Sequence, residues 1–330
     1  MKKIIITGVT GQDGSFMADY LLKNTEHTIV AGIRRLSVKN HDNISHLVNH
    51  PRFKLIDLDV TDSVNTEDVI AKEKPDYFIN FAANSFVGVS WTQPANHMNT
   101  NAMAVMYQLE AIRKHCPKCR YYNAGSSEEF GDVLHSPQSE THPLRPRSPY
   151  GVAKLYAHWM VINYRESYGI FGCSGILFNH ESPLRGQEFV TRKITDTVAK
   201  IKLGLQAHLE LGNMDAKRDW GYAKEYVEGM YLMMQHESPE DWVLATGETH
   251  TVKEFAEKAF NYLGLNWEEY VLTSEKYSRP NEVHHLLGDA SKAKNILGWE
   301  PKTSFDELVK KMVKSDLELA DREKVLIDNG

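Results

Sequence analysis

Residues 3–14 read Lys3-Ile-Ile-Ile-Thr-Gly8-Val-Thr-Gly11-Gln-Asp-Gly14, an apolar run followed by glycines at intervals of three residues. The run predicts a buried parallel strand, and residues 15–23 predict a helix directly after the turn. Glycines let a ligand approach the backbone closely, and a helix N-terminus offers N–H donors and a positive dipole end. The stretch therefore predicts a pyrophosphate cradle, with contacts from Gly8, Thr10, Gly11, Gln12, Asp13 and Gly14.

Further strands alternate with helices through the first half of the chain. We expect strands at 28–33, 53–59, 77–83 and 120–126, and a helix at about 98–114. This alternation predicts a Rossmann-type α/β fold with a doubly wound parallel sheet, whose ligands lie outside the carboxyl ends of the strands. The third strand ends at Asp59 and Val60, where the adenine of a dinucleotide is expected. The fourth ends near Ala82, Ala83 and Ser85, close to the expected nicotinamide ribose and sugar.

The second strand ends in two arginines, Arg34 and Arg35. Folds that select NAD usually carry an acidic residue there, which holds the ribose 2′-hydroxyl. Guanidinium groups suit a 2′-phosphate instead, so the sequence predicts NADP as the cofactor. The competing interpretation is a pair of solvated surface arginines.

A tyrosine and a lysine four residues apart, Tyr150 and Lys154, predict two side chains on one side of a helix. The ammonium lowers the cost of ionising the phenol, so we expect Tyr150 to take a proton from a sugar hydroxyl near neutral pH. Ser126, at the end of the fifth strand, would share the hydrogen bond to that oxygen. Glu128 adds an acid/base group that simple dehydrogenation does not need, which indicates elimination at a neighbouring carbon. The competing interpretations are a packed aromatic for Tyr150 and a surface acid for Glu128.

Length and composition limit the remaining possibilities. The 330 residues favour about two domains, and the net charge of −6 without a long basic run argues against nucleic-acid or membrane-surface binding. Three cysteines make no disulfide framework, which fits a cytoplasmic protein, and neither a signal peptide nor a membrane span is expected. We expect no metal, because Cys116-Pro-Lys-Cys119 lacks a second pair of ligands and is interpreted as two thiols in a turn.

These motifs resemble the extended short-chain dehydrogenase/reductase superfamily and, within it, the GDP-mannose 4,6-dehydratases. The resemblance runs from Gly8 to about Pro301. The specific stretches are Gln-Asp-Gly at 12–14, Asn-His-Glu-Ser-Pro at 179–183 and Arg-Asp-Trp-Gly at 218–221, in that order. The chain departs from the family where Ser126 replaces the usual Thr and Phe86 a common His, which puts the detail of the sugar pocket in doubt.

The resemblance implies an internal redox reaction that retains NADP. Tyr150, helped by Ser126 and Lys154, takes the O4 proton while C4 gives hydride to the cofactor. Glu128 then removes the C5 proton and helps to expel the 6-hydroxyl as water, and hydride returns to C6. By the same resemblance, His180 and Arg185 line the cofactor site, and the GDP-sugar is held by Ser85, Ser126, Glu128, Tyr150, Asn179, Val190, Lys193, Arg218, Arg279 and Glu282.

The rhythm of strands and helices breaks in the second half. We expect helices at 192–203, 252–263 and 305–321, and an extended segment at 279–287. This half is similar to the smaller mixed α/β domain of the family. The expected division is residues 1–178 with 213–240 for the NADP-binding domain and 179–330 for the GDP-sugar-binding domain. By resemblance we also expect a homotetramer, a dimer of dimers, in which the loop 34–46 meets a neighbour's cofactor site.

Three alternatives stay open from the sequence. A GDP-mannoheptose dehydratase would share nearly all of the motifs. A nucleotide-sugar epimerase or 4-reductase would share the fold, although Glu128 argues against it. A non-catalytic NADP sensor is the third alternative, which an intact Tyr150, Lys154 and Glu128 disfavour.

Overall fold

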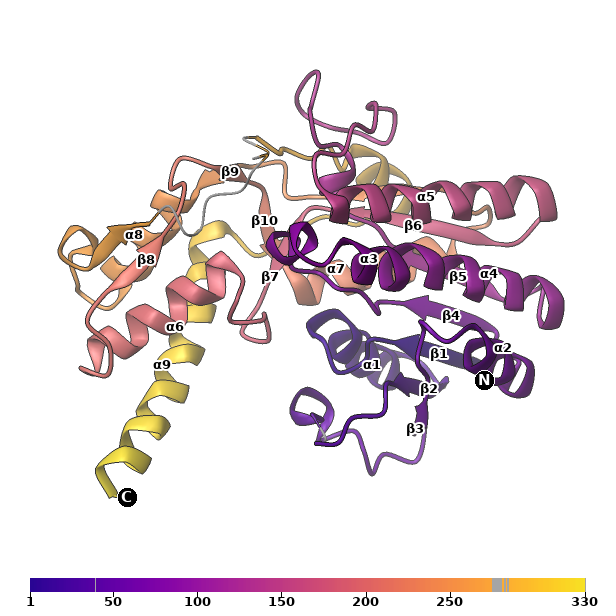
Figure 1. The fold of residues 1–330 in the computed structure, drawn as a ribbon, viewed down its shortest axis with the longest axis horizontal. Coiled ribbons are helices and arrows are strands. Elements are labelled where there is room, and N and C mark those ends of the chain that lie inside the picture. The colour runs from indigo at the N-terminus through magenta and orange to yellow at the C-terminus, as the bar shows by residue number, and fades with distance from the viewer. Residues whose placement is uncertain (39, 275–280, 282, 284, 330) are drawn as a thin grey trace.

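The computed structural model describes residues 1–38, 40–274, 281, 283 and 285–329. Its centre is a sheet of seven parallel strands in the order β3-β2-β1-β4-β5-β6-β11, which confirms the Rossmann-type fold (Figure 1). The order reverses between β1 and β4, and the crevice beside their carboxyl ends is where such sheets bind ligands. The strands are β1 (Lys3–Thr7), β2 (Thr28–Ile33), β3 (Phe53–Asp57), β4 (Tyr77–Asn80), β5 (Arg120–Ala124), β6 (Gly172–Leu177) and β11 (Trp242–Leu244).

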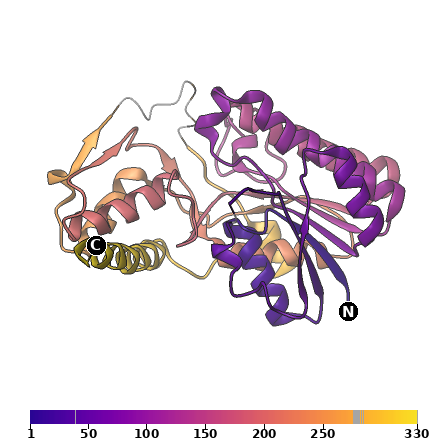
Figure 2. The same cartoon turned by 60° about the horizontal axis from the view of Figure 1, so that its bottom comes forward.

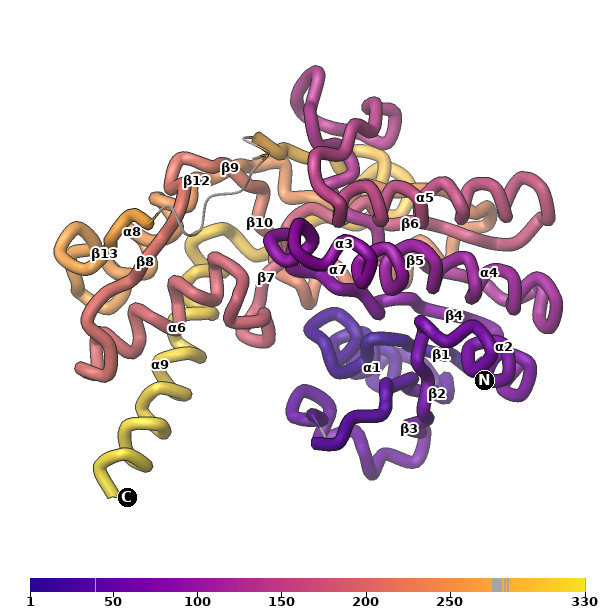
Figure 3. Tube along the Cα trace, in the orientation of Figure 1, coloured from indigo at the N-terminus to yellow at the C-terminus, as the bar shows by residue number. Residues whose placement is uncertain are grey.

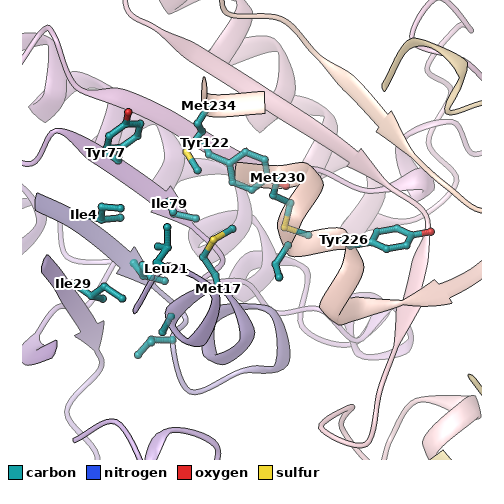
Figure 4. Packing of buried hydrophobic residues seen from close by; sticks show 14 of the residues in the cluster. Ile4, Met17, Leu21, Ile29, Tyr77, Ile79, Tyr122, Tyr226, Met230 and Met234 are labelled. Atoms are coloured by element: carbon teal, nitrogen blue, oxygen red, sulfur yellow. The ribbon is translucent and has the colours of Figure 1, made fainter. Parts of the chain in front are cut away.

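Helices cover both faces of this sheet. Helices α1 (Gln12–Asn24) and α7 (Ala223–Gln235) pack together on one face, while α2 (Ser63–Glu73), α4 (Ala104–His115) and α5 (Pro149–Tyr168) lie on the other (Figure 1). Successive side chains of β1 point to opposite faces of the sheet. Ile4 packs in the hydrophobic cluster with α1 and α7, and Ile5 packs in the cluster with α4 and α5. Figure 4 shows the first cluster, where Met17 and Met230 pack between the strands and the two helices.

Several features of this layer differ from the sequence-based expectation. The strands β3, β4 and β5 end two or three residues before their predicted ends, and β6 was not predicted. The predicted helix at 98–114 is α3 (Pro94–Met98), a π-helical turn (Asn99–Met103) and α4 in succession. The strand β11 was not predicted; it is three residues long and pairs in parallel with β6. Pairing with β6, rather than a local pattern, makes the short segment β11 a strand.

A smaller unit of helices and two-stranded sheets lies beside the main sheet, as Figure 2 shows. Its helices α6 (Val190–Lys202), α8 (Val252–Tyr262) and α9 (Phe305–Asn329) share one hydrophobic core. The helix α9 runs eight residues beyond its predicted end, and its C-terminal turns extend away from the body (Figure 3). The sheets pair β7 (Asn179–Glu181) with β10 (Trp220–Tyr222), β9 (Lys217–Arg218) with β12 (His250–Thr251), and β8 (Leu209–Leu211) with β13 (Val271–Thr273).

The chain crosses between the two units several times. It leaves the main sheet after β6, builds α6, β8 and β9, and returns to the sheet with α7 and β11 before building α8 and α9. The segments that cross, among them β7 and β10, run past the carboxyl ends of the main strands (Figure 1). None of the helices in the described residues is both long and apolar enough to cross a lipid bilayer.

Candidate active site

The glycine turn after β1 is shaped by close backbone contacts. Gly8 has φ +67°, and an added Cβ there would lie 2.7 Å from the backbone nitrogen of Ala82. A Cβ on Gly14 would overlap the carbonyl oxygen of Gly8. Only glycine fits at both positions, so the turn leaves its N–H groups open at the start of α1, as a pyrophosphate requires.

A cavity of about 850 Å³ opens over this turn. It extends from the glycines to the ends of β2, β3 and β4, and the exposed side chains of Arg34 and Arg35 lie on its wall. The volume and the N–H donors of this cavity suit a nicotinamide dinucleotide. The predicted cofactor residues that line it are Gly8, Thr10, Gly11, Gln12, Asp13, Gly14, Arg34, Arg35, Asp59, Val60, Ala82, Ala83, Ser85 and Arg185.

A second cavity of about 820 Å³ continues from the first into the space between the two units. Asp13, Ala83, Ser85 and Arg185 line both cavities, so the two sites meet at the end of β4. The predicted residues that line the second are Ser85, Ser126, Glu128, Tyr150, Lys154, Asn179, His180, Val190, Lys193 and Arg218. Arg279 and Glu282 lie outside the described residues, as do residues 280 and 284 of the predicted extended segment at 279–287.

The start of α5 positions the tyrosine and the lysine. Ser148 caps the helix by accepting a hydrogen bond of 3.0 Å from the N–H of Gly151, and Pro149 occupies the first turn. Tyr150 is buried, and Lys154 donates a hydrogen bond of 2.7 Å from Nζ to the carbonyl oxygen of Ala124 at the end of β5. The Nζ atom lies 5.8 Å from the centroid of the Tyr150 ring.

Burial shifts the pKa values of Tyr150 and Lys154 in directions that the sequence did not predict. Burial is the largest influence on the pKa of Tyr150 and raises it, although a hydrogen bond with Ser126 acts in the opposite direction. Burial likewise lowers the pKa of Lys154 to about 8, against the attraction of Glu129 and Asp13. For these side chains by themselves, burial outweighs the hydrogen bond with Ser126, so the pKa of Tyr150 lies above its ordinary value, and the ionisation expected near neutral pH stays a prediction.

Glu128 is held inside the second cavity. It lies in a 3₁₀ turn, Ser127–Glu129, that follows β5, and it is only 9% exposed. Its N–H donates to the Oγ of Ser126 at 3.2 Å. A Cβ on Gly151 would lie 2.7 Å from the carbonyl oxygen of Glu128, so the turn packs directly against the start of α5. The alternative of a solvated surface acid is excluded.

A buried acid and histidine join the glycine turn to the second unit. Nε2 of His180 lies 2.8 Å from the carboxylate of Asp13, and Nδ1 lies 2.8 Å from the carbonyl oxygen of Phe178. Burial opposes the charged imidazole, but Asp13 outweighs it and raises the pKa of His180. Burial also opposes the charged form of Asp13, yet His180 lowers the pKa of that carboxyl. The pair lies where the two cavities meet, and its ionic character was not predicted.

A contact between two aromatic side chains where the two cavities meet was also not predicted. Phe86, after β4, and Phe189, before α6, meet edge to face with ring centroids 5.7 Å apart. The guanidinium of Arg185 lies 3.7 Å from the Phe189 centroid. Both rings line the second cavity. They lie 103 residues apart and come from loops without a periodic pattern, so no local sequence signal pairs them.

The family model and the curated relatives agree on one family. The model of the family described as GDP-mannose 4,6 dehydratase matches residues 5–312. GDP-mannose 4,6 dehydratase 2 of Arabidopsis thaliana is 51% identical over all of this chain and 90% of its own length.

Solved structures share the fold at lower identity. A dTDP-glucose 4,6-dehydratase from Streptomyces venezuelae, with NAD and TYD bound, has a TM-score of 0.87 at 20% identity and covers 96% of this chain and 97% of its own. RMD from Pseudomonas aeruginosa, complexed with NADPH, has a TM-score of 0.80 at 20% identity and covers 97% and 100%.

Proposed function

The chain belongs to the GDP-mannose 4,6-dehydratase family, and from this membership we propose how its site carries out that reaction. The activity is that of a hydro-lyase, which converts GDP-D-mannose to GDP-4-keto-6-deoxy-D-mannose and water. The observation that carries our assignment of residues is that Glu128, Ser126 and Tyr150 line one cavity, with the acid buried beside the phenol. Two proton-transfer groups side by side suit chemistry on adjacent carbons.

NADP is the cofactor that we propose for the first cavity. The glycine turn, the volume and the two arginines at the end of β2 support it. When bound, its nicotinamide accepts hydride from C4 of the sugar and later returns it to C6. Of the two solved structures described above, one holds NAD and the other NADPH. Our choice of NADP therefore rests on the two arginines.

Tyr150 removes the proton of the 4-hydroxyl in this proposal. Ser126 donates to the same oxygen, since its hydroxyl already interacts with that of Tyr150. Lys154, fixed by its hydrogen bond to the carbonyl oxygen of Ala124, would supply a positive charge near the reacting oxygen and would hold the nicotinamide ribose. Because burial raises the pKa of Tyr150, the positive charge at the site matters more here than at an exposed tyrosine.

Glu128 acts at the next carbon. A 4-ketone acidifies the proton on C5, and Glu128 removes that proton and protonates the departing 6-hydroxyl. Glu128 is buried and lines the same cavity as Tyr150, which supports roles for the two groups on neighbouring atoms of one sugar. The geometry thus serves elimination, which an epimerase or a 4-reductase does not require.

The second unit holds the nucleotide of the substrate in this proposal. Lys193 and Arg218 line the second cavity on its far side and would neutralise the diphosphate, with Asn179 and Val190 completing the contact. Arg279 and Glu282 keep their predicted roles in substrate binding. We propose the division given by the sequence, in which residues 1–178 with 213–240 bind NADP and the rest of 179–330 binds the GDP-sugar, and we extend the NADP-binding domain to β11, which pairs with β6 in the main sheet.

We also propose a homotetramer and a cytoplasmic location. Val152 and Trp159, seven residues apart on one side of α5, expose about half of their surface, which suits a helical face buried against a second copy. The loop at 34–46 stays a predicted contact to a neighbour. Sedimentation of the purified protein tests this assembly directly.

The reaction is tested by incubating the protein with GDP-mannose and a small fraction of an equivalent of NADP⁺. The expected product has lost one water by mass spectrometry, and the cofactor is not consumed overall. Conversion only with stoichiometric NADPH would instead indicate a 4-reductase. A parallel incubation with GDP-mannoheptose determines whether the sugar pocket accepts one carbon more.

A further inference from the structure

A second carboxylate lies beneath the candidate catalytic turn. Glu129 follows Glu128 in the chain, yet its side chain is fully buried and lines neither cavity described above. Its Oε1 accepts a hydrogen bond of 2.8 Å from the N–H of Ser126. A Cβ on Gly125 would lie 2.8 Å from that same oxygen, so the glycine at the end of β5 leaves the room that the carboxylate occupies.

The hydrogen bonds of this turn form a short chain. Glu129 fixes the backbone of Ser126, and the hydroxyl of Ser126 accepts the N–H of Glu128 at 3.2 Å. One buried side chain thereby restrains both residues that we assign to proton transfer in the turn. The arrangement is a capping box closed on a single 3₁₀ turn.

The other oxygen of Glu129 faces a histidine on α5. Nδ1 of His158 lies 3.2 Å from Oε2, and His158 follows Lys154 by one helical turn. Burial opposes a charged imidazole, but Glu129 outweighs burial and raises the pKa of His158. On its far side, Nε2 of His158 lies 4.0 Å from Asp241, which is paired with Arg165 at 2.7 Å.

The charge of Glu129 reaches the candidate catalytic groups on the same helix. Burial is the main influence on Lys154 and lowers its pKa, while Glu129 supports its charged form. Burial also raises the pKa of Tyr150, and the charges of Glu128 and then Glu129 raise it further. A single negative charge below the turn therefore acts on both groups in the same direction.

We propose that Glu129, paired with His158, is a positioning residue for the reaction: it holds Ser126 and Glu128 in place and supplies the negative charge that faces Lys154. This inference rests on the proposed roles of Ser126, Glu128, Tyr150 and Lys154. Glu129 touches neither cavity, so its effect passes through these neighbours.

The test compares Glu129→Gln with the wild-type protein across pH. The amide keeps an oxygen for the N–H of Ser126 but removes the charge. Loss of a negative charge lowers the pKa of both Tyr150 and Lys154, so both limbs of the pH profile of kcat move to lower pH, by about half a unit or more. We expect kcat to fall about tenfold or more while KM for GDP-mannose stays within about twofold.

His158→Gln provides the opposite change. Without the imidazolium, the charge of Glu129 is less compensated, and both limbs move to higher pH. Glu140→Gln is the matched control. Glu140 also holds a backbone N–H, that of Val243 at 2.8 Å, and although it lines a cavity with His158, no hydrogen bond or ion pair given for the described residues joins it to the turn at 126–129. We expect its profile to match the wild type.

Two further results keep the inference separate from the reaction itself. The imidazole of His158, observed by nitrogen-15 NMR, should titrate at lower pH in Glu129→Gln, whether or not the protein turns over GDP-mannose. The proposal would be overturned, even if kcat falls, if the pH profile of kcat did not shift in Glu129→Gln and His158→Gln. It would also be overturned if His158 titrated at the same pH in Glu129→Gln as in the wild type. Failure of the wild type to release water would count against the proposed function. The NMR titration would still test whether Glu129 is paired with His158.

Discussion

His180 lies 2.8 Å from Asp13 through its Nε2 atom, and this contact ties the first turn of α1 to the strand that enters the second unit. Both ring nitrogens of His180 face oxygen acceptors, Asp13 on one side and the carbonyl of Phe178 on the other. Such an environment selects the doubly protonated imidazolium. The ion pair therefore makes the stability of the junction depend on pH.

The first prediction concerns Asp13→Asn. A raised pKa of His180 stabilises the fold below the unfolded value of about 6.5, and this contribution is lost as pH rises through the folded value. The lowered pKa of Asp13 stabilises the fold above its unfolded value of about 3.9 and is lost as pH falls through the folded value. We expect the substitution to reduce the free energy of unfolding by about 1–3 kcal/mol between these limits, and by less at alkaline pH.

Urea denaturation at mildly acidic and at alkaline pH measures this difference. Asp19→Asn is the control, since Asp19 lies on the same helix and pairs with His46 at 2.7 Å, but both side chains are exposed. An exposed pair of this kind contributes at most about 1 kcal/mol. Equal losses in the two variants, or a loss for Asp13→Asn that grows toward alkaline pH, would contradict the buried ion pair.

The second prediction concerns the choice between the two dinucleotides. Replacing Arg34 and Arg35 together by alanine removes the guanidinium groups from the wall of the first cavity. We expect the affinity for NADP to fall about tenfold to a hundredfold, while that for NAD changes by less than about threefold. Calorimetric titration with each dinucleotide measures both values. An equal loss of affinity for NAD would show that the arginines do not bind the 2′-phosphate.

Much of the large unit could be predicted because its signals are local. The strand at 28–33 has the predicted bounds, and the glycine turn was predicted from three glycines in order. The strand β11 could not be predicted, because it has only three residues, lies 64 residues beyond the end of β6 and shows no periodic pattern of its own. Pairing across the sheet, rather than pattern, makes it a strand.

The candidate site also contains residues that could be predicted from the sequence and contacts that could not. Ser126, Glu128, Tyr150 and Lys154 stand in recognisable spacings, whereas most of the sugar-binding residues came only from resemblance to a family. The contact of Phe86 with Phe189 and that of Glu129 with His158 join segments distant in the chain. The raised pKa of Tyr150 escaped prediction for a related reason: spacing reveals the neighbouring charge but not the degree of burial.

The third prediction concerns Gly151. Alanine in a helix normally stabilises it relative to glycine by up to about 1 kcal/mol. Here the added Cβ would meet the carbonyl oxygen of Glu128 at 2.7 Å, so we expect Gly151→Ala to lower both the melting temperature and kcat. Ser167→Ala, at an exposed position near the end of the same helix, is the control and should change neither. A stabilised and fully active Gly151→Ala would show that the turn does not pack as tightly as described.

The last prediction separates the two proton transfers. Glu128→Gln keeps the shape of the side chain in its buried position but removes the base for C5. We expect water loss to slow by about 10²- to 10⁴-fold. Oxidation at C4 depends on Tyr150 and should persist, so reduced cofactor should accumulate to a fraction of the enzyme, visible by its near-ultraviolet absorbance. In deuterium oxide, the variant should also fail to introduce deuterium at C5.

Tyr150→Phe is the matched comparison, because it removes one hydroxyl from the same cavity. It should stop the reaction at the first step, with neither reduced cofactor nor deuterium incorporation. The two variants therefore fail at different points although their side chains line one cavity. If Glu128→Gln released water at the wild-type rate, or if both variants blocked the first step alike, the carboxylate would not be the base at C5, and elimination would need another residue of this cavity.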